Sequence, residues 1–179
     1  MTEDPLAEAM TWLGQQPDTL FLGQGVGCAG TKMSASFEGV PAEKRLEMPV
    51  AENFQLGISI GLSLEGFVPV SVFPRLNFLL CAMDQLINHL DKLPLYSGYR
   101  PKVIIRTAVG NRQPLDAGPQ HTGDFTRHVA RMLSTMQVCQ MLSNGKVLDF
   151  KRGWMSKVSP LEVYQAAYEC KDSKLIVEG

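Results

Sequence analysis

The stretch EMPVAENFQLGISIGLSLEGFVPVSVF, residues 47–73, places one acid, Glu52, at the start of a long and mostly apolar run. Residues 52–65 have the length of a helix and are apolar or small on nearly every side, which predicts a buried helix that its neighbours pack closely. Residues 68–73 are apolar on both faces, as in a central strand of a parallel sheet. Because burying an unpaired acid is unfavourable, Glu52 must be paired or used.

Helices and strands alternate outward from this stretch. Asp4 and Pro5 predict the capped start of a first helix, and Ser159, Pro160 and Glu162 predict a capping box at the last one. The predicted helices are 4–15, 52–65, 76–93, about 124–136 and 159–170, and the predicted strands are 19–23, 68–73, 101–108, 146–150 and 173–179. The rest of 137–158 shows no clear pattern. Helix-length crossovers predict an α/β fold, three-layered and doubly wound, with a mostly parallel sheet and helices on both faces.

Two long loops are rich in Gly, Pro, Ser or Gln: residues 24–44, after the strand 19–23, and residues 109–125, after the strand 101–108. Loops of this length in a compact domain are functional or poorly ordered. Ligands bind beyond the carboxyl ends of the strands in parallel sheets. We therefore expect both loops, and the turn before Glu52, at one ligand-binding edge.

The composition excludes several classes of protein. Among 179 residues, 17 Lys or Arg and 18 Asp or Glu are scattered and give a net charge of −1, so no nucleic-acid partner is expected. No apolar run is long enough to cross a membrane, and the acidic start MTEDPLAEAM lacks the order of a signal peptide. We therefore expect a cytoplasmic protein without membrane contact, folded as one domain over residues 1–179.

The sequence also lacks the motifs of several common sites. The four cysteines form no CxxC pair, which predicts reduced, mostly buried thiols, and the three histidines have no metal-ligand spacing, which predicts no metal site on this chain. There is no GxxxxGK[ST] loop or GxSxG elbow, and GQGVGCAG (23–30) does not lead directly into a helix as a dinucleotide-binding loop does. The remaining residues for chemistry are Glu52, the stretch FPRLNF (73–78) and His121.

A resemblance to a known family rests on these residues. Residues 48–88, MPVAENFQLGISIGLSLEGFVPVSVFPRLNFLLCAMDQLIN, resemble the pyrimidine-binding, transketolase-like domain of thiamine-diphosphate-dependent enzymes, above all the β subunits of the first component of 2-oxoacid dehydrogenases. The shared pattern is Pro49 to Glu52, a Gly-rich helix, Phe73, Asn77-Phe78 and Asp84 to Asn88; QHTGDF (120–125) resembles a Gln–His–Ser loop of the family. The likeness covers about residues 20–179, with a divergent stretch near 137–157.

The resemblance implies the thiamine-diphosphate-binding fold and an enzyme subunit. It implies that Glu52 hydrogen-bonds N1′ of the cofactor's aminopyrimidine. That bond favours the imino tautomer, whose N4′ then takes the proton from C2 of the thiazolium ring. Taken alone, Glu52 also reads as an acid at a helix N-terminus, stabilised by the helix dipole.

The resemblance assigns further residues to the site. Phe78 matches the aromatic ring that packs on the aminopyrimidine, and Pro74 and Leu76 are expected to line the same pocket. His121 matches an active-site histidine that handles the carbonyl oxygen or a proton of the bound substrate. A plain core role for Phe78 and a solvent position for His121 stay open at this point.

Three other positions bear on the site. Arg75 and Gln120 are expected near the substrate, although Arg75 could instead face solvent. Gln24 stands where the related β subunits carry an acidic residue, so the electrostatics beside the cofactor would differ here.

The chain lacks the second domain that such enzymes need. Its signature is GDG followed by a downstream Asn, which holds the diphosphate and Mg²⁺, and no GDG occurs in this sequence. We also expect no C-terminal domain of the β-subunit kind. We therefore expect a partner subunit with the GDG…N motif that binds Mg²⁺ and shares the thiamine diphosphate, in an α2β2 heterotetramer.

The expected function is that of the pyrimidine-binding subunit of a split enzyme. It would act on a 2-oxoacid or a ketose, by decarboxylation and carboligation or by ketol transfer. The alternatives are a non-catalytic subunit that stabilises or regulates such an enzyme, and a protein that binds a small ligand in the same cleft without the cofactor.

Overall fold

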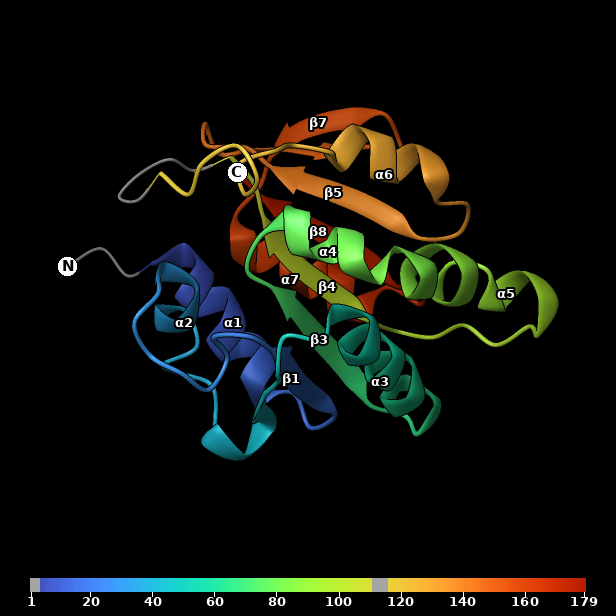
Figure 1. Cartoon of the computed structure of the whole chain (residues 1–179), viewed down its shortest axis with the longest axis horizontal. Helices are drawn as coiled ribbons and strands as arrows, with labels where there is room; N and C mark the ends of the chain where they lie inside the picture. Colours follow the sequence, from blue (N-terminus) through green and yellow to red (C-terminus); the bar gives the residue numbers. More distant parts are fainter. Residues whose placement is uncertain (1–3, 111–115) are drawn as a thin grey trace.

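The computed structural model describes residues 4–110 and 116–179 (Figure 1). Residues 111–115 of the predicted second loop lie outside the described residues. Helices and strands alternate from the first helix to the last strand. The strands are β1 (Thr19–Gly23), β2 (Arg45–Glu47), β3 (Val68–Phe73), β4 (Ile104–Ala108), β5 (Gln137–Met141), β6 (Lys146–Asp149), β7 (Trp154–Lys157) and β8 (Lys174–Glu178).

The helices vary more in length and geometry than the strands do. The α-helices are α1 (Pro5–Gln15), α2 (Lys32–Ala35), α3 (Glu52–Leu64), α4 (Leu76–Leu79), α5 (Leu93–Tyr96), α6 (Thr126–Met132) and α7 (Pro160–Glu169). Two 3₁₀ turns, Ala42–Lys44 and Leu80–Ala82, and one π-helical segment, Gln85–Leu90, complete the regular structure of the described residues.

All eight strands form one sheet in the order β2-β1-β3-β4-β8-β5-β6-β7. Every neighbouring pair from β2 to β5 is parallel, whereas β6 and β7 are added as an antiparallel hairpin. The predicted α/β fold with a mostly parallel, doubly wound sheet is confirmed. The carboxyl ends of the parallel strands therefore lie along one edge of the sheet.

Helices cover both faces of the sheet, as predicted. One apolar core lies under α1 and α7, which pack together, and includes Met10, Phe21 and Tyr164. The other lies under α3, α4, the π-helical segment and α6, and includes Leu56, Phe73 and Leu86 (Figure 1). Side chains of the central strands alternate between the two cores, which explains why those strands read as continuous apolar runs.

The predicted capped starts of the first and the last helix are confirmed. The Asp4 carboxylate accepts a hydrogen bond from the Leu6 N–H with Pro5 at the first helical position. At α7, Ser159 and Glu162 exchange side-chain to backbone hydrogen bonds in a capping box. Each cap satisfies backbone N–H groups that the first turn of a helix leaves free.

Several predicted elements are corrected by the structure. Residues 76–93 do not form one helix, because the chain changes from α to 3₁₀ to π geometry along them. Residues 137–158 contain three strands, of which only β6 was predicted, and the three-residue strand β2 was missed. Sequence periodicity cannot show such short, partly exposed strands.

The prediction of mostly buried thiols is wrong. Cys28 and Cys81 are exposed, Cys170 is half-buried and only Cys139 is buried. All four thiols are free, and burial raises the pKa of the Cys139 thiol to about 11.

Among the described residues, no helix has both the length and the apolar content that crossing a membrane requires.

A buried ion pair joins the two strands at the centre of the sheet. Arg106 on β4, 1% exposed, donates two hydrogen bonds to the Glu178 carboxylate on β8 and a third to the Ser36 hydroxyl. The Tyr164 hydroxyl of α7 donates to the same carboxylate. Burial and the charge of Glu178 raise the pKa of Tyr164 well above its usual value, so the phenol stays protonated as a donor.

Asp91 fixes the end of the helical segment to the start of β5. Its carboxylate is fully buried and accepts hydrogen bonds from the backbone N–H groups of Ser134, Thr135 and Met136 and from Lys92 Nζ. Burial alone would raise its pKa, but these hydrogen bonds outweigh burial and lower the pKa from 3.8 to about 2.

We predict that Asp91→Ala destabilises the fold by about 3 kcal/mol at neutral pH, since three backbone N–H groups, of which that of Met136 is buried, lose their common acceptor and Lys92 loses its partner. Chemical denaturation at constant pH measures the loss. Asp172→Ala is the matched control, because Asp172 pairs with the exposed Arg100 and should contribute less than about 1 kcal/mol. Equal losses in the two variants would contradict the assignment.

The lowered pKa of Asp91 also predicts a pH dependence. A carboxylate whose pKa is lower in the folded state stabilises above its unfolded pKa and loses that contribution as the pH falls through the folded value. About 2 kcal/mol should therefore disappear between pH 3.8 and about 2 in the wild type. Asp91→Ala should lack this part of the acid transition.

Candidate functional site

The predicted site residues follow strands that lie side by side. β2, β1 and β3 are parallel neighbours and β4 pairs with β3, so their carboxyl ends lie together. Glu52 follows β2, Phe78 follows β3 and His121 lies in the loop after β4. The expectation that both long loops and the turn before Glu52 meet at one edge of the sheet is confirmed by this topology.

Gln55 holds the first turn of α3 above that edge. Its side-chain amide is fully buried and donates to Ser71 Oγ at 3.1 Å and to the Val72 carbonyl at 3.0 Å on β3. A longer contact of 3.4 Å reaches the Leu22 carbonyl on β1. The Gln55 Oε1 atom has no hydrogen-bond donor in the described part of the chain.

Gly23 allows β1 and β3 to approach closely at the same place. It adopts a φ of 149°, and a Cβ built on it would lie 2.2 Å from the Val72 carbonyl oxygen. No other residue type fits such an approach without moving the backbone. The loop after β1 therefore starts beside the carboxyl end of β3.

Glu52 is the first residue of α3 and is 8% exposed. It precedes Gln55 by three residues, so both side chains lie on the helix face that meets the sheet edge. Among the described residues, the Glu52 carboxylate forms no ion pair and accepts no side-chain hydrogen bond. The buried acid is therefore available as an acceptor for a group from outside this part of the chain.

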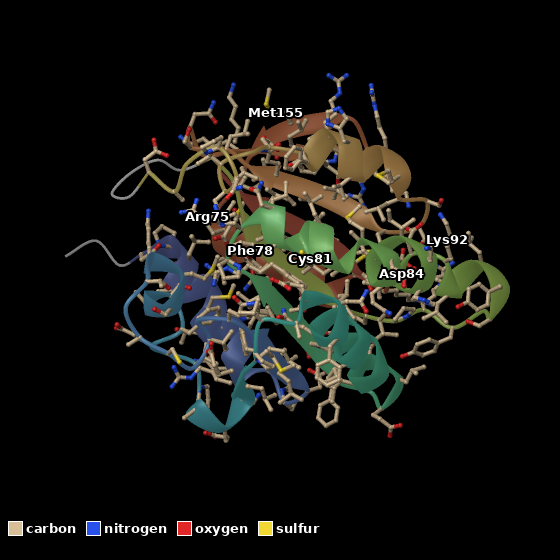
Figure 2. All side chains as sticks on the ribbon, viewed as in Figure 1. Arg75, Phe78, Cys81, Asp84, Lys92 and Met155 are labelled. Atoms are coloured by element: carbon tan, nitrogen blue, oxygen red, sulfur yellow. The ribbon has the colours of Figure 1, made fainter. Side chains whose placement is uncertain are left out.

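Phe78 and His121, both of which the resemblance assigns to the site, lie together. Their ring centroids are 5.3 Å apart with an edge-to-face angle of 76°. Arg75 also joins this group, because its Nη1 donates to the His121 carbonyl oxygen at 3.3 Å. Figure 2 shows Arg75 and Phe78 at the start of α4, near the centre of the molecule. The turn after β3 is thus tied to the loop after β4.

The other predicted residues occupy different environments. Pro74 and Gln24 are half-buried, and Gln120 is exposed beside His121. Leu76 is fully buried in the core with Leu56 and Phe73, so any contact of Leu76 with a ligand would involve its backbone.

The sequence analysis missed two acids that shape the loops. The Glu47 carboxylate, at the end of β2, accepts hydrogen bonds from the N–H groups of Gly25 at 2.8 Å and Gly27 at 2.6 Å. It thereby holds the loop after β1. In the sequence, Glu47 follows a short polar segment, and nothing there indicates its role as long as the strand β2 is unknown.

Asp124 holds the loop that carries His121. Its carboxylate accepts hydrogen bonds from the Thr126 N–H, the Thr126 hydroxyl and the Gln140 amide of β5. Burial opposes ionisation, but these hydrogen bonds outweigh it and lower the pKa of Asp124.

Two hollows in the described part of the chain lie away from these residues. A hollow of about 320 Å³ lies among residues 26–31, α2, Glu38 and Arg45, and another of about 210 Å³ lies between α6 and Phe150. Neither is lined by Glu52, Phe78 or His121. No group of three or more His, Cys, Asp or Glu residues that could hold a metal occurs in the described part.

Comparison with curated sequences finds β subunits of 2-oxoacid dehydrogenases. The chain is 29% identical over 151 residues to the pyruvate dehydrogenase E1 component subunit beta of Chaetosphaeridium globosum, which covers 81% of this chain and 45% of that protein. It is also 29% identical over 140 residues to the mitochondrial counterpart of Caenorhabditis elegans, covering 76% of this chain and 40% of that protein. No protein-family model matches the chain.

Comparison with solved structures finds transketolases. A split gene transketolase, described as an inactive beta4 tetramer, superposes with a TM-score of 0.67 at 20% identity, covering 97% of this chain and 48% of that chain. Transketolase from Campylobacter jejuni gives a TM-score of 0.66 at 12% identity, covering 98% of this chain and 25% of that chain.

The chain therefore has a transketolase-like fold, and the predicted resemblance is confirmed at the level of the fold. Its sequence is similar, more particularly, to the β subunits of pyruvate dehydrogenase E1 components. The chain spans less than half the length of these curated relatives.

We predict that Asp124→Ala increases hydrogen–deuterium exchange in the loop around His121 and at Thr126 by about tenfold or more, because three hydrogen bonds lose their common acceptor. Mass spectrometry of peptic fragments measures it. The matched control is Asp116→Ala, since Asp116 makes only a local hydrogen bond to the Gly118 N–H. Unchanged exchange in Asp124→Ala would show that Asp124 does not hold the loop.

Proposed function

We propose that this chain is the pyrimidine-binding subunit of a split thiamine-diphosphate-dependent enzyme. The observation that carries the proposal is Glu52, a buried acid at the start of α3 with no ion-pair partner among the described residues. The similarity to β subunits of 2-oxoacid dehydrogenases and the transketolase fold support it. The relatives are longer than this chain, so the activity of the complete enzyme is part of what we propose.

The residues at the edge suit an aminopyrimidine ring. Glu52 offers a carboxylate that can share a proton with a ring nitrogen, N1′, and Phe78 offers a half-buried aromatic face for stacking. Gln55 adds an unpaired buried acceptor one turn along the same helix. Bound thiamine diphosphate would supply a carbon nucleophile at the thiazolium C2, and Glu52 would favour its formation by holding the proton at N1′.

His121 would serve the substrate side of the site. Its ring is positioned by Phe78 and its backbone carbonyl by Arg75, while a histidine can exchange a proton near neutral pH. We propose that His121 hydrogen-bonds the carbonyl oxygen of a 2-oxoacid or ketose. The side chains of Arg75 and Gln120 would lie beside the substrate carboxylate or hydroxyl groups.

A partner chain would complete the site through the outer face of α3. Phe54 and Leu64 are more than half exposed on this face, and Gly57 and Gly61 lie between them at helical spacing. Small residues flanked by apolar ones let another helix pack closely. We propose that the partner carries the GDG…N motif, binds the diphosphate and Mg²⁺, and forms an α2β2 heterotetramer with this chain in the cytoplasm.

The reaction would be decarboxylation with carboligation or ketol transfer. A non-catalytic subunit that stabilises or regulates a related enzyme is the second candidate, and the replacement of an acid by Gln24 favours it. Calorimetry of the assembled complex separates the two, because a non-catalytic assembly would not take up thiamine diphosphate at this site.

We predict that Glu52→Gln lowers the activity of the assembled enzyme by about a hundredfold or more, since an amide cannot hold the N1′ proton as a carboxylic acid does. The chain is co-expressed with the partner that bears GDG…N and assayed with thiamine diphosphate and Mg²⁺. Glu65→Gln, an exposed acid at the far end of the same helix, is the matched control. Full activity of Glu52→Gln with bound cofactor would end the proposed mechanism.

We predict that Gly61→Leu abolishes assembly while the lone chain keeps its stability. A Cβ at Gly61 meets no atom within 4 Å, and leucine favours a helix more than glycine by about 1 kcal/mol. Co-purification and size-exclusion chromatography measure assembly. Glu169→Leu on α7 adds the same side chain to an exposed site elsewhere, and assembly should survive it. Normal assembly of Gly61→Leu would place the partner on another face.

A further inference from the structure

Positive charge is concentrated in one part of the chain. Residues 126–157, which form α6 and β5 to β7, contain six Lys or Arg residues and one acid, whereas the other residues contain eleven Lys or Arg and seventeen acids. The net charge of −1 therefore results from a basic segment and an acidic remainder whose charges nearly cancel. We call β6, its turn and β7, residues 146–157, the basic hairpin, and its cations are Lys146, Lys151, Arg152 and Lys157.

These cations have no acidic partner within the described residues. The one acid of the segment, Asp149, is 2% exposed and accepts hydrogen bonds from the backbone N–H groups of Lys151 and Arg152. Lys151 Nζ donates to the carbonyl groups of Ser134 and Thr135. The salt bridges described elsewhere in the fold do not involve the basic hairpin.

Two of the lysines lie directly opposite each other. The antiparallel register of β6 and β7 pairs Lys146 with Lys157. Like charges at such a position repel, so the pair is unfavourable until an anion lies between them or beside them. Both lysines are exposed, and an anionic side chain can reach them from solvent.

β7 is the last strand of the sheet and presents an open edge. It also carries two exposed apolar side chains, Trp154 at 38% and Met155 at 53%. Figure 2 shows Met155 at the outer boundary of the molecule, on β7, with nitrogen-tipped side chains along the same boundary. An edge strand with exposed apolar side chains is a template for another strand.

We propose that the basic hairpin binds an extended acidic segment of a protein partner, which adds a strand to β7. The free backbone groups of β7 pair with the segment, Trp154 and Met155 contact its apolar side chains, and Lys146 and Lys157 bind its carboxylates. A nucleic acid can accept hydrogen bonds from N–H groups, but it cannot extend the sheet along β7, because it lacks the alternating N–H and C=O groups of a peptide. A long polyanion would extend past the basic hairpin. Its outer part would lie farther than about 8 Å, the screening length at physiological salt, from the cations of the hairpin and would approach the acidic remainder of the chain.

The test uses the full chain in a Trp12→Phe background, which leaves Trp154 as the only tryptophan. The probe is a synthetic peptide of about ten residues that alternates glutamate and valine. We expect a saturable change in Trp154 fluorescence, weakened about tenfold or more when salt rises from about 50 to about 500 mM. A lysine–valine peptide of the same length should give no change.

Lys146→Gln combined with Lys157→Gln should weaken binding of the acidic peptide at least about tenfold. Lys32→Gln combined with Lys171→Gln removes two exposed lysines elsewhere and is the matched control, which should bind normally. Lysines on an edge strand can instead serve only to prevent aggregation. In that case the Lys146/Lys157 variant would self-associate with unchanged peptide binding, which would overturn the proposal. No saturable binding, or tighter binding of an oligodeoxynucleotide of equal charge, would also overturn it.

Discussion

The position of Glu52 depends on one buried amide. Gln55 donates to both Ser71 and the Val72 carbonyl at the end of β3, and this fixes the rotation of α3 over the sheet. Because Glu52 lies one turn earlier on the same face, its buried carboxylate is brought to the edge where the parallel strands end. A helix rotated by one residue would expose the acid to solvent and bury an apolar side chain in its place. The amide thus converts an ordinary helix start into a site.

The loops depend on a second layer of acids. Glu47 fixes the backbone of the loop after β1, and Asp124 fixes the loop after β4, each through hydrogen bonds from groups outside its own turn. Arg75 joins the second loop to α4. The parallel sheet brings the chain segments to one edge, and these polar contacts set their final geometry. The rest of the active site in the proposed enzyme would come from the partner.

Much of the fold could be predicted from the sequence, because the central strands and α3 have strong apolar patterns and α1 and α7 also have clear caps. The resemblance to a family named both Phe78 and His121 as site residues, but only the structure shows that their rings are in contact. The three-residue strand β2 and the irregular helix after Phe78 could not be predicted, since neither has a period of its own. The roles of Glu47 and Asp124 required the loops in three dimensions. The basic hairpin was hidden by an even overall charge, and only the strand register shows that Lys146 faces Lys157.

The ion pair between Arg106 and Glu178 has a consequence for how the chain folds. The two residues are 72 positions apart, yet they lie on adjacent central strands. Until β8 enters the sheet, β4 has one unpaired side and Arg106 has no counter-charge in a region that will exclude water. Contacts so distant along the chain form late and slow the folding of a domain. Fragments that stop before β8 would therefore lack the strand that joins β4 to β5 at the middle of the sheet.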